Sequence, residues 1–289
     1  MTLPSNMTIL QSDADGATRV VYKTGSFTTG SDMPKINTAR LRSISIFSAV
    51  AIVALAGEVS AQSRPSRVLE IELGAAWQDR NDVQIPNDSN GTRFALDGVT
   101  GSGPFFAPRI QFSTPLAPRH ELRLLAAPFG ITESGSLDKL VKFQGQTFAV
   151  GDVEAKYRFS SYRATWRYTL HEDSDWMWKA GVTGKIRDAE ITLRQGSVTA
   201  TKSNIGFVPL LHLYGERRLD DRSRLTFEGD GLAGGPGRAF DVSTRYVRDI
   251  DERASVFAGL RILDGGADSS SSYNFARIYY LTLGLQYGM

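Results

Sequence analysis

Apolar and polar residues alternate through most of the chain that follows Ala61. In the segment 67–78, apolar side chains occupy every second position, and the positions between them hold acidic residues and glycine. A β-strand places successive side chains on opposite faces, so this period of two predicts a strand with one apolar and one polar face. The apolar set is Leu69, Ile71, Leu73, Ala75 and Trp77, and the polar set is Glu70, Glu72 and Gly74.

Nine further segments show a similar alternation, and the sequence therefore predicts about ten strands. Short turns alternate with longer loops between them, with one exception at 234–238, which is no longer than a turn. This alternation is typical of an up-and-down barrel in a membrane, and a soluble β-sandwich does not require it. The predicted long loops include 195–204 and 264–274. A barrel of twelve strands is the alternative, because 141–149 could either form a hairpin with 131–135 or add two spanning strands. The predicted strands are 67–78, 105–114, 121–129, 153–170, 176–194, 205–218, 223–233, 239–249, 253–263 and 275–288.

A second pattern precedes the strands. The apolar run 44–56 follows Lys35, Arg40 and Arg42 and is followed by small residues up to Ala61. This order of basic, apolar and small residues predicts a cleavable secretory signal over 33–61. A run this short falls below the roughly 20 residues that a spanning helix needs. We interpret residues 1–32 as disordered chain or as an extension upstream of the true start, and 62–289 as the barrel.

Composition narrows the possible partners. Residues 1–61 hold five of the 33 Lys and Arg and four of the 31 Asp and Glu, which leaves 28 basic and 27 acidic residues in 62–289. This balance gives no support for nucleic acid as a partner. The chain has no Cys, and nothing in the sequence indicates a metal or a cofactor.

The positions expected to face the lumen are rich in charge. Basic residues dominate the strands near 153–194 and acids dominate those near 205–241, so opposite charges should meet across the lumen. The set predicts either a plug of ion pairs or a narrow polar pore. Its members are Glu70, Glu72, Arg109, Glu121, Arg123, Arg163, Arg167, Lys179, Lys185, Arg187, Glu216, Glu228, Asp230, Asp241, Arg245 and Arg261.

One histidine belongs to the same face. If the strands 205–218 and 223–233 pair about Asp221, His212 lies opposite Asp230 and Tyr214 opposite Glu228. A histidine oriented by a carboxylate is the beginning of an acid–base site, although it is also an ordinary hydrogen bond. His212 and Asp230 are the weak catalytic candidates.

The C-terminal segment 282–289 resembles the targeting signal of outer-membrane barrels, with Thr282, Gly284 and Tyr287 in its pattern and Met289 where an aromatic residue is usual. The wider architecture is similar to small bacterial barrels such as the omptin proteases or the OmpW-like proteins. The resemblance implies a Gram-negative outer membrane, with its lipids and lipopolysaccharide and the barrel-insertion machinery as partners. It specifies neither an activity nor an oligomeric state.

Two classes of function follow. The first is a non-enzymatic barrel, which is either structural or a narrow passive pore. The alternative is a membrane-embedded hydrolase that acts on peptides or lipopolysaccharide, with His212 and Asp230 at its centre.

Overall fold

The computed structural model describes residues 9–12, 18–21 and 67–289. The first two segments are strands β1 (Ile9–Ser12) and β2 (Thr18–Val21), which pair as an antiparallel hairpin. The expected signal at 33–61 lies outside the described residues, as does most of 1–32. No helix in the described part of the chain has the length and apolar character needed to cross a membrane.

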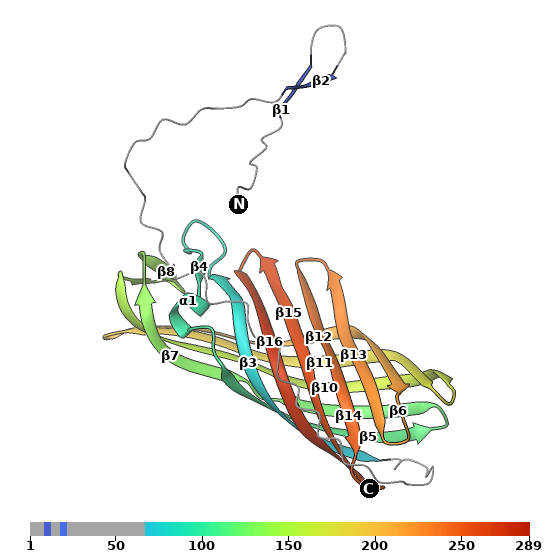
Figure 1. Cartoon of the computed structure of the whole chain (residues 1–289). Helices are drawn as coiled ribbons and strands as arrows, with labels where there is room; N and C mark the ends of the chain where they lie inside the picture. The colour runs from blue at the N-terminus through green and yellow to red at the C-terminus, as the bar shows by residue number, and fades with distance from the viewer. Residues whose placement is uncertain (1–8, 13–17, 22–66) are drawn as a thin grey trace, which may run out of the picture. The chain divides into compact units, whose positions relative to one another are not determined.

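Residues 67–289 form a closed antiparallel β-barrel of ten strands in up-and-down order, and the last strand pairs with the first (Figure 1). The prediction of a transmembrane antiparallel barrel with about ten strands is confirmed. The wall consists of β3 (Val68–Gln84), β5 (Phe105–Ala117), β6 (His120–Ala127) with β7 (Gly130–Leu137), β10 (Gly151–Glu172), β11 (Trp176–Gln195), β12 (Val198–Arg218), β13 (Ser223–Gly234), β14 (Gly237–Asp249), β15 (Ala254–Ser269) and β16 (Ser272–Gly288).

The third wall position is shared by two strands, β6 and β7. β6 pairs with the half of β10 near its C-terminal end, and β7 pairs with the other half. Pro128 lies between them and has no backbone N–H to donate. The ladder is nevertheless continuous in register, since Ala127 lies opposite Ser161 and Gly130 opposite Arg158.

The twelve-strand alternative is wrong. The segment 131–135 belongs to β7, and the segment 141–149 forms its own hairpin from β8 (Val141–Phe143) and β9 (Gln146–Phe148). Each of these two strands has three residues, whereas about 9–11 residues are needed to span a bilayer. They pair with each other and not with the barrel wall.

Tight turns join the strands at the end of the barrel where the C-terminus lies. Aspartates in three of these turns accept hydrogen bonds from the backbone two residues later: Asp173 from Asp175, Asp220 from Arg222 and Asp251 from Arg253. This is the turn chemistry expected of Asp. In the first turn, hydrogen bonds from the backbone N–H groups of Trp176 and Asp175 and from His171 lower the pKa of Asp173 to about 2.

At the opposite end, two of the predicted loops are wrong. The segments 195–204 and 264–274 are mostly strand, and only Gly196 and Ser197, and Ser270 and Ser271, connect them. Antiparallel pairing satisfies the backbone in water as well as in lipid, so the ladder continues although the side chains become polar. β10, β11 and β12 reach 22, 20 and 21 residues, while β13 and β14 have only 12 and 13.

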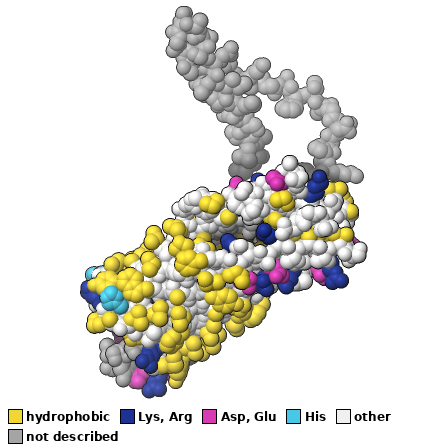
Figure 2. Space-filling view, turned by 180° about the vertical axis from the view of Figure 1, so that it is seen from behind, with side chains coloured by type: hydrophobic (Ala, Val, Ile, Leu, Met, Phe, Trp, Pro, Cys, Tyr) yellow, Lys and Arg dark blue, Asp and Glu magenta, His cyan; other side chains and the backbone are white. Residues whose placement is uncertain are grey.

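The outer surface carries an apolar belt. Figure 2 shows hydrophobic side chains gathered on one part of the barrel wall, with polar and charged side chains over the other part. The apolar face predicted for the first strand is outside, with Ile71 and Leu73 46% and 52% exposed, and Glu70 and Glu72 inside. Such an exposed apolar surface fits a lipid bilayer as its solvent.

The interior has two layers. The charged side chains lie in the half near the tight turns, and an apolar core lies in the other half. This core includes residues of the segment between β3 and β5, which contains β4 (Phe94–Ala95) and α1 (Asp97–Thr100), and of the β8–β9 hairpin. The pattern of the sequence did not predict this core. Its fully or almost fully buried members include Val83, Phe94, Leu96, Val99, Val141, Phe143, Phe148, Ala155, Tyr157 and Leu193.

Polar contacts attach α1 to the wall. The Gln78 Nε2 donates to Thr100 Oγ1 at 2.7 Å and to the Gly101 carbonyl at 2.6 Å. On the opposite side, a Cβ at Gly135 would lie 2.2 Å from the Val99 carbonyl oxygen, so only glycine lets α1 approach β7 this closely.

Candidate functional site: the charged lumen

The charges predicted for the lumen lie inside the barrel, and all of them are buried or half-buried. The half-buried members are Glu121, Lys179, Arg187 and Glu228. Because the strand period is two, one parity on every strand brings these side chains to the same interior. The structure also shows how they are paired, which parity does not determine.

The central cluster joins opposite walls of the barrel. Arg163 on β10 donates to Asp230 on β13 at 2.7 Å and to Asp241 on β14 at 2.5 Å. Arg123 on β6 pairs with Glu228 on β13. The prediction that basic and acidic strands face each other across the lumen therefore agrees with the structure, and these pairs cross the space that a pore would need.

A second cluster lies beside the seam where the barrel closes. Arg245 on β14 pairs with Glu70 at 2.8 Å and Glu72 at 2.7 Å on β3. Arg109 approaches Glu72 at 3.4 Å. Arg261 on β15 contacts Asp241 at 2.5 Å, and this links the two clusters through one carboxylate.

The third cluster lies near the tight turns. Glu121 pairs with Arg167 and, at 2.6 Å, with Lys179. Arg224, which is not among the predicted lumen charges, pairs with Asp249 and lies 3.6 Å from Glu216. Arg224 has the same strand parity as Glu228 and Asp230, and this signal could have identified it.

The predicted pairing of His212 with Asp230 is present. The two residues are direct partners in the β12–β13 ladder, as are Tyr214 and Glu228. The His212 Nδ1 lies 2.9 Å from the Asp230 Oδ1, which also accepts a hydrogen bond of 2.7 Å from Thr183. The Tyr214 hydroxyl donates to Glu216 instead.

This pair lacks other parts of a catalytic site. The His212 side chain is fully buried, and its Nε2 has no hydrogen-bond partner among the described residues. A general base must reach the proton that it removes, directly or through one water. The Thr183 hydroxyl donates to Asp230 rather than to the imidazole. The geometry is that of a buried hydrogen bond.

His212, Glu228 and Asp230 also place potential metal-ligand atoms within 4.8 Å of one another. Guanidinium groups already contact these carboxylates, since Arg123 pairs with Glu228 and Arg163 with Asp230. A divalent cation there would be repelled by both arginines. We assign no metal to this cluster.

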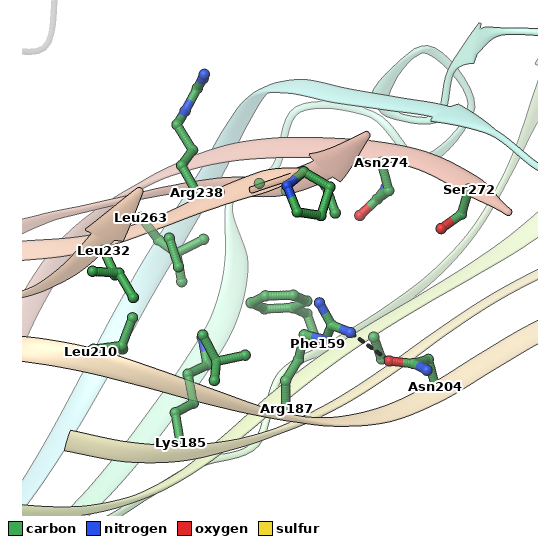
Figure 3. A pocket seen from close by; sticks show the side chains of 18 of the residues that line it. Phe159, Lys185, Arg187, Asn204, Leu210, Leu232, Arg238, Leu263, Ser272 and Asn274 are labelled. Atoms are coloured by element: carbon green, nitrogen blue, oxygen red, sulfur yellow. Dashed lines mark hydrogen bonds between the residues drawn. The ribbon is translucent and has the colours of Figure 1, made fainter. Parts of the chain in front are cut away.

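Two basic side chains are outside the ion-pair network. Lys185 is 4% exposed, and among the described residues its ammonium makes no hydrogen bond or ion pair. Its Nζ lies 5.0 Å from the centroid of the Phe159 ring. Arg187 donates to the amide oxygen of Asn204 and contacts no carboxylate. Both residues line a cavity of about 620 Å³ (Figure 3).

The segment that resembles a targeting signal is the closing strand β16. Tyr287 and Met289 are exposed on the outer face, and Thr282 is 1% exposed on the inner face. A Cβ at Gly284 would lie 2.2 Å from the Phe257 ring and 2.5 Å from the Ile71 carbonyl oxygen. Close packing of β16 against β15 and β3 therefore favours glycine at this position, whatever the insertion machinery recognises.

Comparison with known proteins gives likeness in fold only. No protein-family model matches the chain, and no curated protein is similar to it in sequence. Among solved structures, the outer membrane protease OmpT from Escherichia coli is 9% identical, with a TM-score of 0.49 over 77% of this chain and 96% of OmpT. Neisserial surface protein A is 10% identical, with a TM-score of 0.34 over 79% of this chain and 100% of that one. The KdgM porin is 9% identical, with a TM-score of 0.31 over 76% and 99%.

Proposed function

We propose that this protein is a non-conducting outer-membrane β-barrel of a Gram-negative bacterium, exported by the predicted signal at 33–61. The exposed apolar belt supports a membrane location. Ion pairs across the lumen support the absence of a channel, which favours the structural form of the predicted function over the passive pore.

The proposal rests on the contacts of Arg163. Its guanidinium extends from β10 to carboxylates on β13 and β14, and its side chain is 1% exposed. A conducting lumen would have to break these contacts, and breaking a buried pair costs about 3–5 kcal/mol.

The apolar belt also indicates which molecules surround the protein. Lipids of the outer membrane contact the apolar wall, and lipopolysaccharide adjoins the end that carries the extended strands. The barrel-insertion machinery would assemble the protein, with β16 as the closing strand.

A planar-bilayer recording of folded, purified protein tests the proposal. We expect no conductance steps under conditions in which a control porin in the same bilayer conducts. Heat-modifiable migration of the same preparation verifies that the silent protein is folded. Steps of reproducible size from this preparation would contradict the plug and restore the passive pore.

A further inference from the structure

The barrel wall is open between β12 and β13. The two strands pair from Arg218 and Arg224 up to Leu211 and Gly231, and no pairing continues beyond that point. β12 nevertheless extends to Val198, paired with β11 alone, while β13 ends at Gly234 (Figure 1). Pro209 lies two residues beyond Leu211, the last paired residue of β12, and has no N–H to donate, which suits a strand edge.

The opening begins at the upper border of the apolar belt. Phe240 is the partner of Gly231 and is exposed on the outer face. On β11, Ile186 is the partner of Phe207, and both are exposed. Beyond these residues the outward positions hold Asp188 and Glu190 on β11 and Arg238 on β14, beside the exposed Ile205 on β12. Unpaired backbone N–H and C=O groups are costly in hydrocarbon, where water cannot pair with them. The unpaired strand edge lies at the border of the belt, where this cost is smaller.

A cavity of about 620 Å³ lies behind this opening, and its size is in the range of ligand pockets, roughly 300–1,000 Å³. Phe159, Leu210, Leu232 and Leu263 supply apolar walls (Figure 3). Leu232 has lumen parity, yet it is 42% exposed, because the wall in front of it is missing. The opening between β12 and β13 thus gives an apolar molecule in the cavity a lateral route to the apolar belt.

The deep side of the cavity is positively charged. The acids that line it already have basic partners: Asp230 and Asp241 contact Arg163, Glu190 contacts Lys156, and Asp264 contacts Arg238. Lys185 and Arg187 lie two residues apart on one face of β11 and have no carboxylate partner among the described residues. A buried cation without a partner is expensive, and an anion of the ligand would relieve this cost.

We propose that this cavity binds a long-chain carboxylate. The carboxylate would pair with Lys185 and Arg187, and the acyl chain would lie along Leu210, Leu232 and Leu263 and leave through the opening between β12 and β13. One ammonium and one guanidinium match a single anionic group, and the apolar walls match a single chain. This proposal is independent of the closed lumen, since binding and conductance are measured separately.

Equilibrium binding of sodium palmitate to the full chain in lipid nanodiscs tests this site. We expect wild-type protein to bind palmitate more tightly than uncharged hexadecanol or sodium acetate, because only palmitate supplies both the anion and the chain. Lys185→Gln should weaken binding by about tenfold or more, the effect of losing a hydrogen bond to a charged group. Lys139→Gln is the matched control, because Lys139 is exposed and does not line the cavity.

A second variant tests the opening without changing a charge. Leu232→Trp should fill the mouth of the cavity and weaken palmitate binding, while heat-modifiable migration shows that the barrel is folded. The proposal is overturned by absence of palmitate binding to wild type, by equal affinities of Lys185→Gln and Lys139→Gln, or by hexadecanol or acetate binding as tightly as palmitate. Unchanged affinity in folded Leu232→Trp would remove the lateral route.

Discussion

The carboxylate of Asp230 contacts side chains from several strands inside the barrel. Asp230 accepts hydrogen bonds from Thr183 and Arg163 and contacts His212, and Arg123 Nη2 lies 3.8 Å away. These partners come from β6, β10, β11 and β12, so one side chain on β13 links four other strands. A group with so many buried partners is difficult to replace, because each partner would lose its counter-charge or its acceptor.

We therefore expect Asp230→Leu to destabilise the barrel by about 3–5 kcal/mol, since it leaves Arg163 with one carboxylate fewer in a buried site. His212→Gln retains hydrogen-bonding capacity and should leave stability almost unchanged. Urea unfolding followed by heat-modifiable migration measures both changes. Comparable losses of stability in the two variants would show that the imidazole, and not only the carboxylate, is required.

The same variants test the hydrolase alternative. If His212 and Asp230 were catalytic, wild type would hydrolyse a peptide mixture or lipopolysaccharide, and this activity would disappear in folded His212→Gln protein. We expect no such activity, because the Nε2 of His212 is buried. Hydrolysis by wild type that is lost in this variant would make the protein an enzyme.

At the scale of the strand, the important property is the distance between neighbouring backbones. On β16, Gly284 faces inward, where a Cβ would meet the Phe257 ring and the backbone of β3. On β13, by contrast, a Cβ at Gly229 would meet only Val242 Cγ2, at an ordinary 3.7 Å. The two strand glycines thus differ in their surroundings, since Gly284 faces the lumen and Gly229 the outer surface.

We predict that Gly284→Ala destabilises the folded barrel by about 1–3 kcal/mol, the usual cost of overpacking. Gly229→Ala should change stability little and is the matched control. The measurement is urea unfolding of purified, refolded protein, which separates the folded barrel from recognition during insertion. Equal midpoints for the two variants would refute the packing explanation and leave targeting as the only role of Gly284.

At the scale of the molecule, the two ends of the barrel differ. The turns with aspartate caps and the C-terminus lie at one end, while the extended strands, α1 and the β8–β9 hairpin lie at the other (Figure 1). The second end holds the long connections from β3 to β5 and from β7 to β10, beside two-residue turns between β11 and β12 and between β15 and β16. In an outer-membrane barrel, short turns face the periplasm and longer connections face outward. This arrangement fixes the expected orientation of every connection.

We expect cysteines introduced at Asn90 and Ser270 to react with a membrane-impermeant maleimide on whole cells. Cysteines at Ser174 and Asp221 should react only after the outer membrane is opened. The chain has no native Cys, so each variant reports one site. Labelling of Ser174→Cys on intact cells would reverse the orientation.

The sequence alone determined the barrel, its ten strands and the side chains on each face. These properties are local, because the period of two fixes the parity of a strand and Asp, Gly and Pro mark its turns. Even the juxtaposition of His212 and Asp230 follows from pairing two consecutive strands about a short turn. Glu70 and Glu72 were placed inside for the same reason.

Tertiary structure decided what happens between distant strands. Parity places Arg163 and Lys185 alike on the inner face of the barrel, but only closure of the wall gives Arg163 two carboxylates and leaves Lys185 with none. The apolar core around Phe143 depends on where the β8–β9 hairpin folds back into the barrel. The opening beyond Leu211 depends on where the hydrogen-bonded ladder between β12 and β13 stops. Contacts across a barrel join residues far apart in the chain, and no local period records them.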